Sequence, residues 1–85
     1  MSATAREMIA RYGAREIPLA RICEEHFGLS VKLAKERAAK AELPVPAYKV
    51  ARNGEWLVRA DDLAELLDRE HARAKDRLAM VQGAA

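Results

Sequence analysis

Two prolines close together near the middle of the chain, in Leu43-Pro44-Val45-Pro46, limit what it can fold into more than any other feature. Proline has no backbone N–H to donate and its ring clashes with the preceding helical turn, so a helix does not continue through this segment. Prolines spaced in this way favour an extended connector. We therefore expect separate helices before the connector and a different arrangement after it.

The first residues of the chain show the spacing of a short helix. Apolar side chains from Ala5 to Tyr12 fall at i, i+3, i+4 and i+7, which is the pattern of one helical face. Gly13 follows directly and is a natural helix stop, because glycine adopts the left-handed conformation without strain. An N-terminal helix is predicted over residues 5–13.

A helix-turn-helix is predicted over residues 18–41. Ile17 is expected to be extended because it precedes a proline, and Pro18 suits the first turn of a helix. Gly28 is expected to end this helix, and Ser30 to cap the next one. The inward face of the second helix is predicted from its small and apolar residues, which are Val31, Ala34, Ala38 and Ala41.

A β-hairpin, or wing, is predicted over residues 47–59, because strand-like residues flank Asn53-Gly54. Asn-Gly is a strong hairpin signal, since both residues tolerate positive φ. A tight two-residue turn at this point predicts three cross-strand pairs, which are Arg52 with Glu55, Ala51 with Trp56, and Val50 with Leu57. Trp56 and Tyr48 are expected to anchor the hairpin in the core.

A long helix is predicted over residues 61–82, with Asp61 and Asp62 near its positive end. About twenty residues span roughly 30 Å, which is close to the width of a small domain. The second half of the helix is therefore expected to project beyond the core and to pair two copies of the chain. The residues expected at this dimer contact are Leu67, Ala74, Leu78 and Val81.

The chain has 85 residues, which predicts a single domain over residues 1–85. No stretch is apolar enough to predict a membrane span or a secretory signal, and a single cysteine gives weak support for a reducing compartment. We therefore expect a cytoplasmic protein. The net charge of +2 is unevenly distributed, because residues 30–59 carry seven basic side chains against three acidic ones.

This local excess of positive charge predicts a surface that binds double-stranded DNA. On the second helix of the pair the candidate DNA-binding residues are Ser30, Lys32, Lys35, Glu36, Arg37 and Lys40. In the wing they are Lys49, Arg52, Asn53 and Arg59. The flanking cations and the first helical turn suit phosphates better than base edges.

A more ordinary interpretation of the same charges stays open. Lys32, Glu36 and Lys40 are four residues apart and could form a solvated ion-pair ladder on the helix surface. The cations of the wing could serve only to keep an edge strand soluble. The order of the predicted elements favours DNA binding over both.

Nothing in the sequence predicts catalysis, a metal site or a cofactor. Glycine-rich phosphate loops, nucleophile motifs and spaced metal ligands are all missing from the pattern. His26 and His71 are far apart and have no third ligand at a suitable spacing. Cys23 is expected to pack on an apolar helix face. We expect a protein that is not an enzyme.

Four short motifs, in order, resemble the pyocin transcriptional activator family, the PrtN-type proteins, from about residue 8 to residue 75. They are Ile17-Pro18-Leu19, Phe27-Gly28-Leu29-Ser30, Leu43-Pro44-Val45-Pro46 and Asp62-Leu63-Ala64. The layout is also similar to the broader MerR-like and excisionase-like winged helix-turn-helix group. Family members have a longer wing with Gln and Lys, whereas a tight turn is predicted here.

The resemblance implies a mainly α protein with a small β-hairpin, that is, a winged helix-turn-helix with a long C-terminal helix. It implies a sequence-specific activator of phage- or bacteriocin-type genes that contacts DNA through the helix after Ser30. Further partners implied are RNA polymerase or a phage regulator, beside a second copy of the chain. Two alternatives remain, which are an excisionase-like protein that bends DNA and an antirepressor that binds another regulator.

Overall fold

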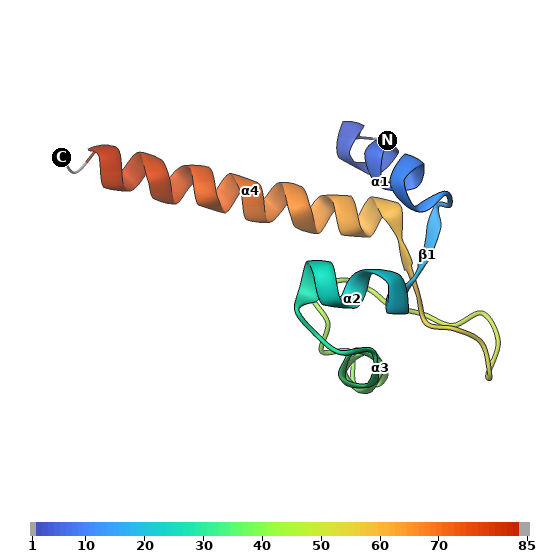
Figure 1. Ribbon diagram of the computed structural model, residues 1–85. Coiled ribbons are helices and arrows are strands. Elements are labelled where there is room, and N and C mark those ends of the chain that lie inside the picture. Colours follow the sequence, from blue (N-terminus) through green and yellow to red (C-terminus); the bar gives the residue numbers. More distant parts are fainter. Residues whose placement is uncertain (1, 84–85) are drawn as a thin grey trace.

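The computed structural model describes residues 2–83. Within this range the chain forms four helices and one two-stranded antiparallel sheet, which confirms the mainly helical class with a small β element (Figure 1). In chain order the elements are α1 (Ala3–Tyr12), β1 (Glu16–Pro18), α2 (Leu19–Phe27), α3 (Val31–Ala39), β2 (Leu57–Arg59) and α4 (Ala60–Gly83).

The helix boundaries follow the local signals in the sequence. The Ser2 hydroxyl caps α1 by accepting from the backbone N–H of Ala5 at 3.1 Å, and Gly13 ends the helix with φ of 79°. Gly28 ends α2 with φ of 66°, and the Ser30 hydroxyl caps α3 by accepting from the N–H of Leu33 at 3.2 Å. The predicted glycine stops and the predicted Ser30 cap are confirmed.

α3 is shorter than predicted, because it ends at Ala39 instead of reaching residue 41. Ala41 has φ of 55°, the left-handed conformation that usually ends a helix, and the N–H of Glu42 donates to the carbonyl of Arg37 at 2.9 Å. The predicted inward face was wrong at both ends, since Val31 is 37% exposed and Ala41 is exposed. Only Ala34 and Ala38 of that face are buried.

The sheet differs from the predicted hairpin. β2 pairs with β1, so that Ile17 lies opposite Val58, and both side chains are fully buried. On its other edge β2 makes a single bridge, between Leu57 and Tyr48. The predicted pairing of Val50 with Leu57 was therefore wrong, because on that edge Leu57 exchanges both of its backbone hydrogen bonds with Tyr48.

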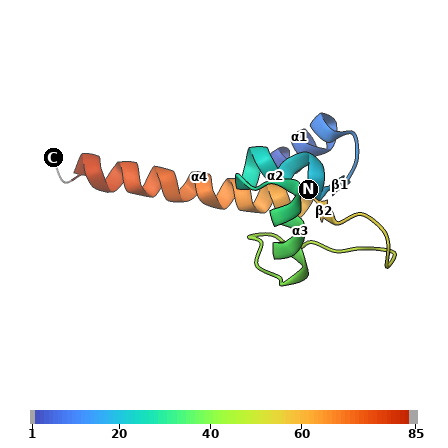
Figure 2. The ribbon, with the colours of Figure 1, turned by 60° about the horizontal axis from the view of Figure 1, so that its bottom comes forward.

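The predicted tight turn at Asn53-Gly54 was also wrong. The positive φ values within residues 2–83 belong to Gly13, Gly28 and Ala41, so neither residue of the Asn-Gly pair has the conformation of the expected turn. The chain reverses one step earlier, where the N–H of Gly54 donates to the carbonyl of Ala51 at 2.9 Å. Residues 49–56 consequently form a loop that extends beyond the helices (Figure 2).

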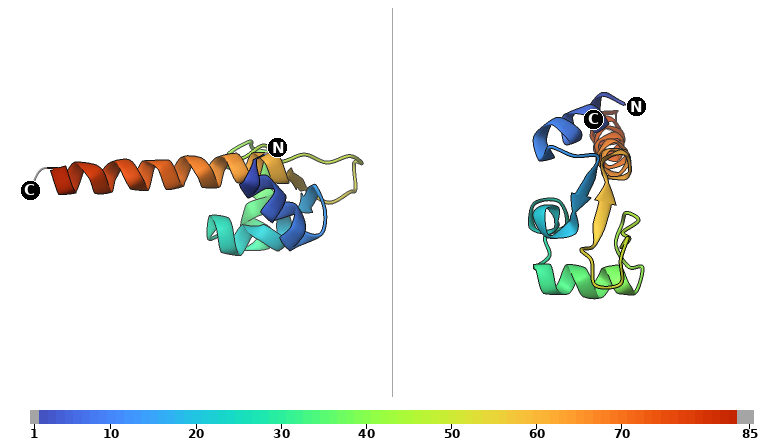
Figure 3. Two further views of the ribbon diagram at one scale, coloured as in Figure 1. Left: turned by 90° about the horizontal axis from the view of Figure 1, so that it is seen from above. Right: turned by 90° about the vertical axis from the view of Figure 1, so that its right-hand side faces the viewer.

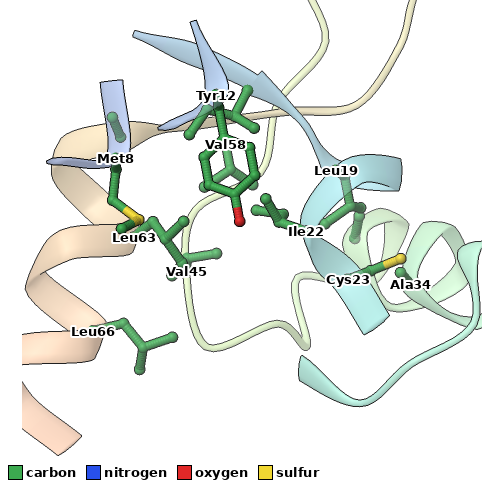
Figure 4. Close-up of a cluster of buried hydrophobic side chains, with 13 residues drawn as sticks. Met8, Tyr12, Leu19, Ile22, Cys23, Ala34, Val45, Val58, Leu63 and Leu66 are labelled. Atoms are coloured by element: carbon green, nitrogen blue, oxygen red, sulfur yellow. The ribbon is translucent and has the colours of Figure 1, made fainter. Parts of the chain in front are cut away.

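One core joins the elements (Figure 4). Its fully buried large side chains are Ile17, Leu19, Ile22, Leu63, Val58 and Cys23. Val45 from the extended connector is also buried, which explains how a proline-rich segment is fixed against the helices. Cys23 packs on the apolar face of α2 as predicted, whereas Trp56 and Phe27 are only partly buried at the edge of the core.

α4 is the longest element, and its second half leaves the core. Its first half packs against α1, where the Thr4 hydroxyl donates to an Asp68 carboxylate oxygen at 2.7 Å. The remainder projects to one side, which gives the molecule extents of 54 × 26 × 17 Å (Figure 1). The predicted projection is confirmed. Among residues 2–83 there is no helix that is both long enough and apolar enough to cross a bilayer.

Candidate nucleic-acid interface

α3 lies at one end of the molecule, and the two strands run between it and the start of α4 (Figure 3, right). Its contact with α2 depends on two small side chains, Ala34 at 0% and Ala38 at 8% exposure. Small residues allow the two helices to approach closely, so the rest of α3 stands clear of the protein. The outward surface of α3 is therefore free to meet a partner.

The cationic side chains of α3 are exposed and not neutralised by acids. Lys32, Lys35 and Arg37, and Lys40 at the C-cap, are all exposed. The ion pairs within residues 2–83 involve Arg11, His26 and Arg73, and none involves α3. The predicted ladder through Glu36 is therefore not formed at ion-pair distance, and the positive charge of α3 faces solvent.

The loop 49–56 carries its own cations beside an aromatic ring. The Lys49 ammonium lies 5.1 Å from the centroid of the Trp56 ring, and it donates to the carbonyl of Arg52 at 3.4 Å. A cation over an aromatic face is attracted by the ring quadrupole. Trp56 thus holds the Lys49 side chain in place, a role that the sequence did not reveal because no short-range pattern links the two residues.

A cavity of about 270 Å³ joins α3 to this loop. Lys35 lines it from α3, and Lys49 and Asn53 line it from the loop, together with the start of α2 at Pro18 and Leu19. Glu55 also lines the cavity but forms no ion pair with either lysine. Three predicted DNA-binding residues from two separate segments are thereby brought to one concave surface.

Two of the predicted DNA-binding residues, Arg37 and Arg59, do not line this cavity. Arg37 lines a second cavity on the other flank of α3, beside Glu42. Arg59 lies opposite Glu16 in the sheet, and its pKa is raised chiefly by the neighbouring Tyr48 hydroxyl and further by Glu16 and Asp62. These acidic neighbours offset part of the positive charge of Arg59.

The first turn of α3 offers backbone donors. The Ser30 hydroxyl accepts from the N–H of Leu33, and the Ser30 carbonyl accepts from the N–H of Ala34. The N–H groups of Val31 and Lys32, which come before them in the helix, have no partner within residues 2–83. Free amides at a helix N-terminus suit an anion such as phosphate. No group of His, Cys, Asp or Glu side chains in the same range is arranged to hold a metal ion.

Comparisons with known proteins complete this description. A search of curated proteins and a search of solved structures each found no match to the chain. A family model described as "Pyocin activator protein PrtN" matches residues 4–74, which include all of α2, α3 and the sheet. Because this match covers most of the 85 residues, the chain belongs to the pyocin activator protein PrtN family.

Proposed function

We propose that this protein binds double-stranded DNA as a winged helix-turn-helix transcription regulator. Its family consists of regulators and indicates a role in the control of pyocin genes. The observation that carries the proposal is the unpaired positive charge of α3 and the loop 49–56, which share one cavity. In this proposal α3 enters the major groove and the loop acts as the wing.

The dimensions of the two partners support this arrangement. The major groove of B-DNA is about 12 Å wide and admits one α-helix. The outward face of α3 presents Lys32, Glu36 and Lys40, whose long polar side chains can reach base edges. Activation of phage- or bacteriocin-type genes would follow from recognition of a promoter element by this face.

Phosphate contacts come from the flanks of the same surface. Lys35 and Lys49 on the shared cavity, with Asn53 beside them, would hold one strand of the duplex backbone. The free N–H groups at the start of α3 would hold another phosphate. Arg37 and Arg52 add charge at the two edges, whereas Arg59 is expected to contribute less because Glu16 lies opposite it.

Duplexes selected from a random pool provide the test. Fluorescence anisotropy should show tight binding that weakens steeply with salt, since each phosphate contact releases bound counterions. Lys32→Ala and Lys35→Ala should each weaken binding by about 1 kcal/mol, and loss of a phosphate contact should reduce the salt slope by about one.

Arg69→Ala is the matched control, because Arg69 is an exposed cation on α4 far along the chain from α3. Its affinity should equal that of the wild type. Equal losses of affinity for Arg69→Ala and Lys35→Ala would contradict the proposed face, since only net charge would then matter.

Salt-sensitive binding with strong bending of the DNA but no promoter activation would identify an excisionase-like protein. Capture of another regulator without DNA binding would identify an antirepressor.

A further inference from the structure

One acidic side chain lies in the middle of the cationic surface of α3. The helix carries a single acid, Glu36. The cations around it are Lys32, Lys35 and Arg37 on the helix and Lys40 at its C-cap, and all five side chains are exposed. A carboxylate at this place weakens the attraction of α3 for a polyanion, since phosphate groups repel it. Glu36 therefore opposes DNA binding unless it accepts a hydrogen bond from the duplex.

Glu36 lies on the side of α3 that points away from the rest of the protein. The side that packs against α2 is marked by Ala34 and Ala38, which are 0% and 8% exposed. Glu36 is two residues from each of them, which places it roughly 160–200° around the helix axis from both. Lys32 and Lys40 lie about one turn before and one turn after it. Glu36 is thus at the centre of the face that would meet base edges.

No contact within residues 2–83 gives Glu36 a structural role. It takes part in none of the ion pairs of this range, and its carboxylate accepts none of the side-chain hydrogen bonds. It lies in the second turn of α3, beyond the first turn in which an acid stabilises a helix through the macrodipole. The carboxylate is therefore free to accept hydrogen bonds from a partner.

The major groove limits what an ionised carboxylate can contact, because the carboxylate only accepts hydrogen bonds. Guanine presents the acceptors N7 and O6, and thymine presents the acceptor O4 and a methyl group, so neither base offers a donor. Adenine offers its N6 amino group but carries the acceptor N7 beside it. Cytosine offers the N4 amino group alone. Cytosine is therefore the base that best fits a side chain with acceptors only.

We propose that Glu36 determines sequence specificity by accepting a hydrogen bond from the N4 amino group of cytosine in the major groove. This inference rests on the proposed DNA binding and names a position at which α3 discriminates between bases. Guanine or thymine at that position would leave the carboxylate without a donor and beside acceptors, so such a duplex is rejected by repulsion as well as by the lost hydrogen bond. Glu36 thus lowers overall affinity and raises specificity.

The neighbouring lysine extends the pattern that is read. Lys32 has donors only, so it fits the O6 and N7 acceptors of guanine. The four residues from Lys32 to Glu36 rise by about 6 Å, which is close to two base-pair steps of about 3.4 Å each. With α3 lying along the groove, a guanine and a cytosine about two base pairs apart are therefore expected in the target sequence.

Exchange of the carboxylate for an amide tests the proposal directly. Glu36→Gln keeps the length and the helix propensity of the side chain, but the amide both donates and accepts and so fits N6 and N7 of adenine. Duplexes selected from a random pool by the full wild-type chain and by the variant should differ at one position, where cytosine is replaced by adenine. Fluorescence anisotropy on these two duplexes should show a preference of about tenfold for cytosine that reverses in the variant.

Glu36→Ala removes the acceptor without a replacement. This variant should bind a duplex of unrelated sequence about threefold more tightly than the wild type, because one repulsive charge is lost. It should also lose most of the preference for cytosine. Glu42→Gln is the matched control, because it removes the same charge from an exposed residue that follows α3 and lies beside Arg37 on another cavity. It should still select cytosine.

The possible outcomes separate this proposal from the one on which it rests. Absence of salt-sensitive DNA binding in the wild type would overturn both. Salt-sensitive binding with the same base preference in the wild type, Glu36→Gln and Glu36→Ala would overturn the role of Glu36 alone. A gain of affinity in Glu36→Ala without a loss of preference would also overturn it, since Glu36 would then act only through its charge. Circular dichroism checks that the variants keep their helix content.

Discussion

At the scale of single residues, small local conformations determine where the helices stop. Gly13 and Gly28 occupy left-handed positions at no steric cost, whereas Ala41 occupies one with a Cβ atom, which costs roughly 1–2 kcal/mol. The strained position lies at the end of α3, next to the Leu43-Pro44-Val45-Pro46 connector. The chain accepts this strain because Val45 then reaches the core.

Ala41→Gly is therefore expected to stabilise the protein by about 0.5–1 kcal/mol, since removal of the strain exceeds the added entropy of the unfolded chain. The urea midpoint should rise with an unchanged slope. Ala39→Gly, in the last helical position of α3, is the control and should lower stability by up to about 1 kcal/mol. A lower midpoint for Ala41→Gly would contradict the expectation.

At the scale of elements, α1 and α2 are linked by a polar cluster as well as by the core. Arg11 on α1 forms an ion pair with Glu25 on α2, and the Tyr12 hydroxyl lies 2.8 Å from His26 Nε2. The hydrogen bond from Arg11 holds the pKa of Glu25 below its ordinary value. The ion pair between Arg11 and Glu25 therefore ties α1 to α2 only while Glu25 is ionised.

This link predicts a dependence of stability on pH. A lowered pKa in the folded state contributes stability above the unfolded value, about 4.3 for Glu, and that stability is lost as the pH falls through the folded value. Wild-type protein should consequently lose more stability than Glu25→Gln between about pH 5 and pH 3. Glu24→Gln, at a position without an ion pair in the described part of the chain, should behave like the wild type.

Elements held by adjacent residues could be predicted from the sequence, and elements held by distant ones could not. The Ser30 cap and the Gly28 stop act within four residues, so their patterns were sufficient. The pairing of Ile17 with Val58 depends on what the core buries. The strong local signal of Asn53-Gly54 pointed to a tight hairpin, whereas the two segments make a single antiparallel bridge, between Tyr48 and Leu57, around a longer loop. For the same reason the exposed cations of α3 could be predicted from the sequence. The position of Lys35 and Lys49 on one cavity could not, because they come from segments that the fold brings together.

At the scale of the whole molecule, the core and the projecting half of α4 are separable. The exposed residues of the second half make no contribution to the buried core, and the family match ends at residue 74.

If two copies pair through Leu78 and Val81, as the sequence predicts, a chain that ends at Lys75 should keep the thermal stability of the core and become monomeric. The full chain should select duplexes with two inverted half-sites centred about one helical turn apart, and the shortened chain should bind one half-site without cooperativity. Calorimetry and footprinting measure the two effects. Cooperative binding by the shortened chain would place the contact between copies outside residues 76–83.

One feature of the fold gives the long helix a mechanical role. β2 ends at Arg59 and α4 begins at Ala60, with no loop between them, and the N–H of Ala60 is fixed by the carbonyl of Arg15 at 2.8 Å. No flexible segment therefore separates the strand that borders the loop from the helix that projects from the core. A small tilt at the base of the loop would be magnified at the far end of α4, roughly 35 Å away.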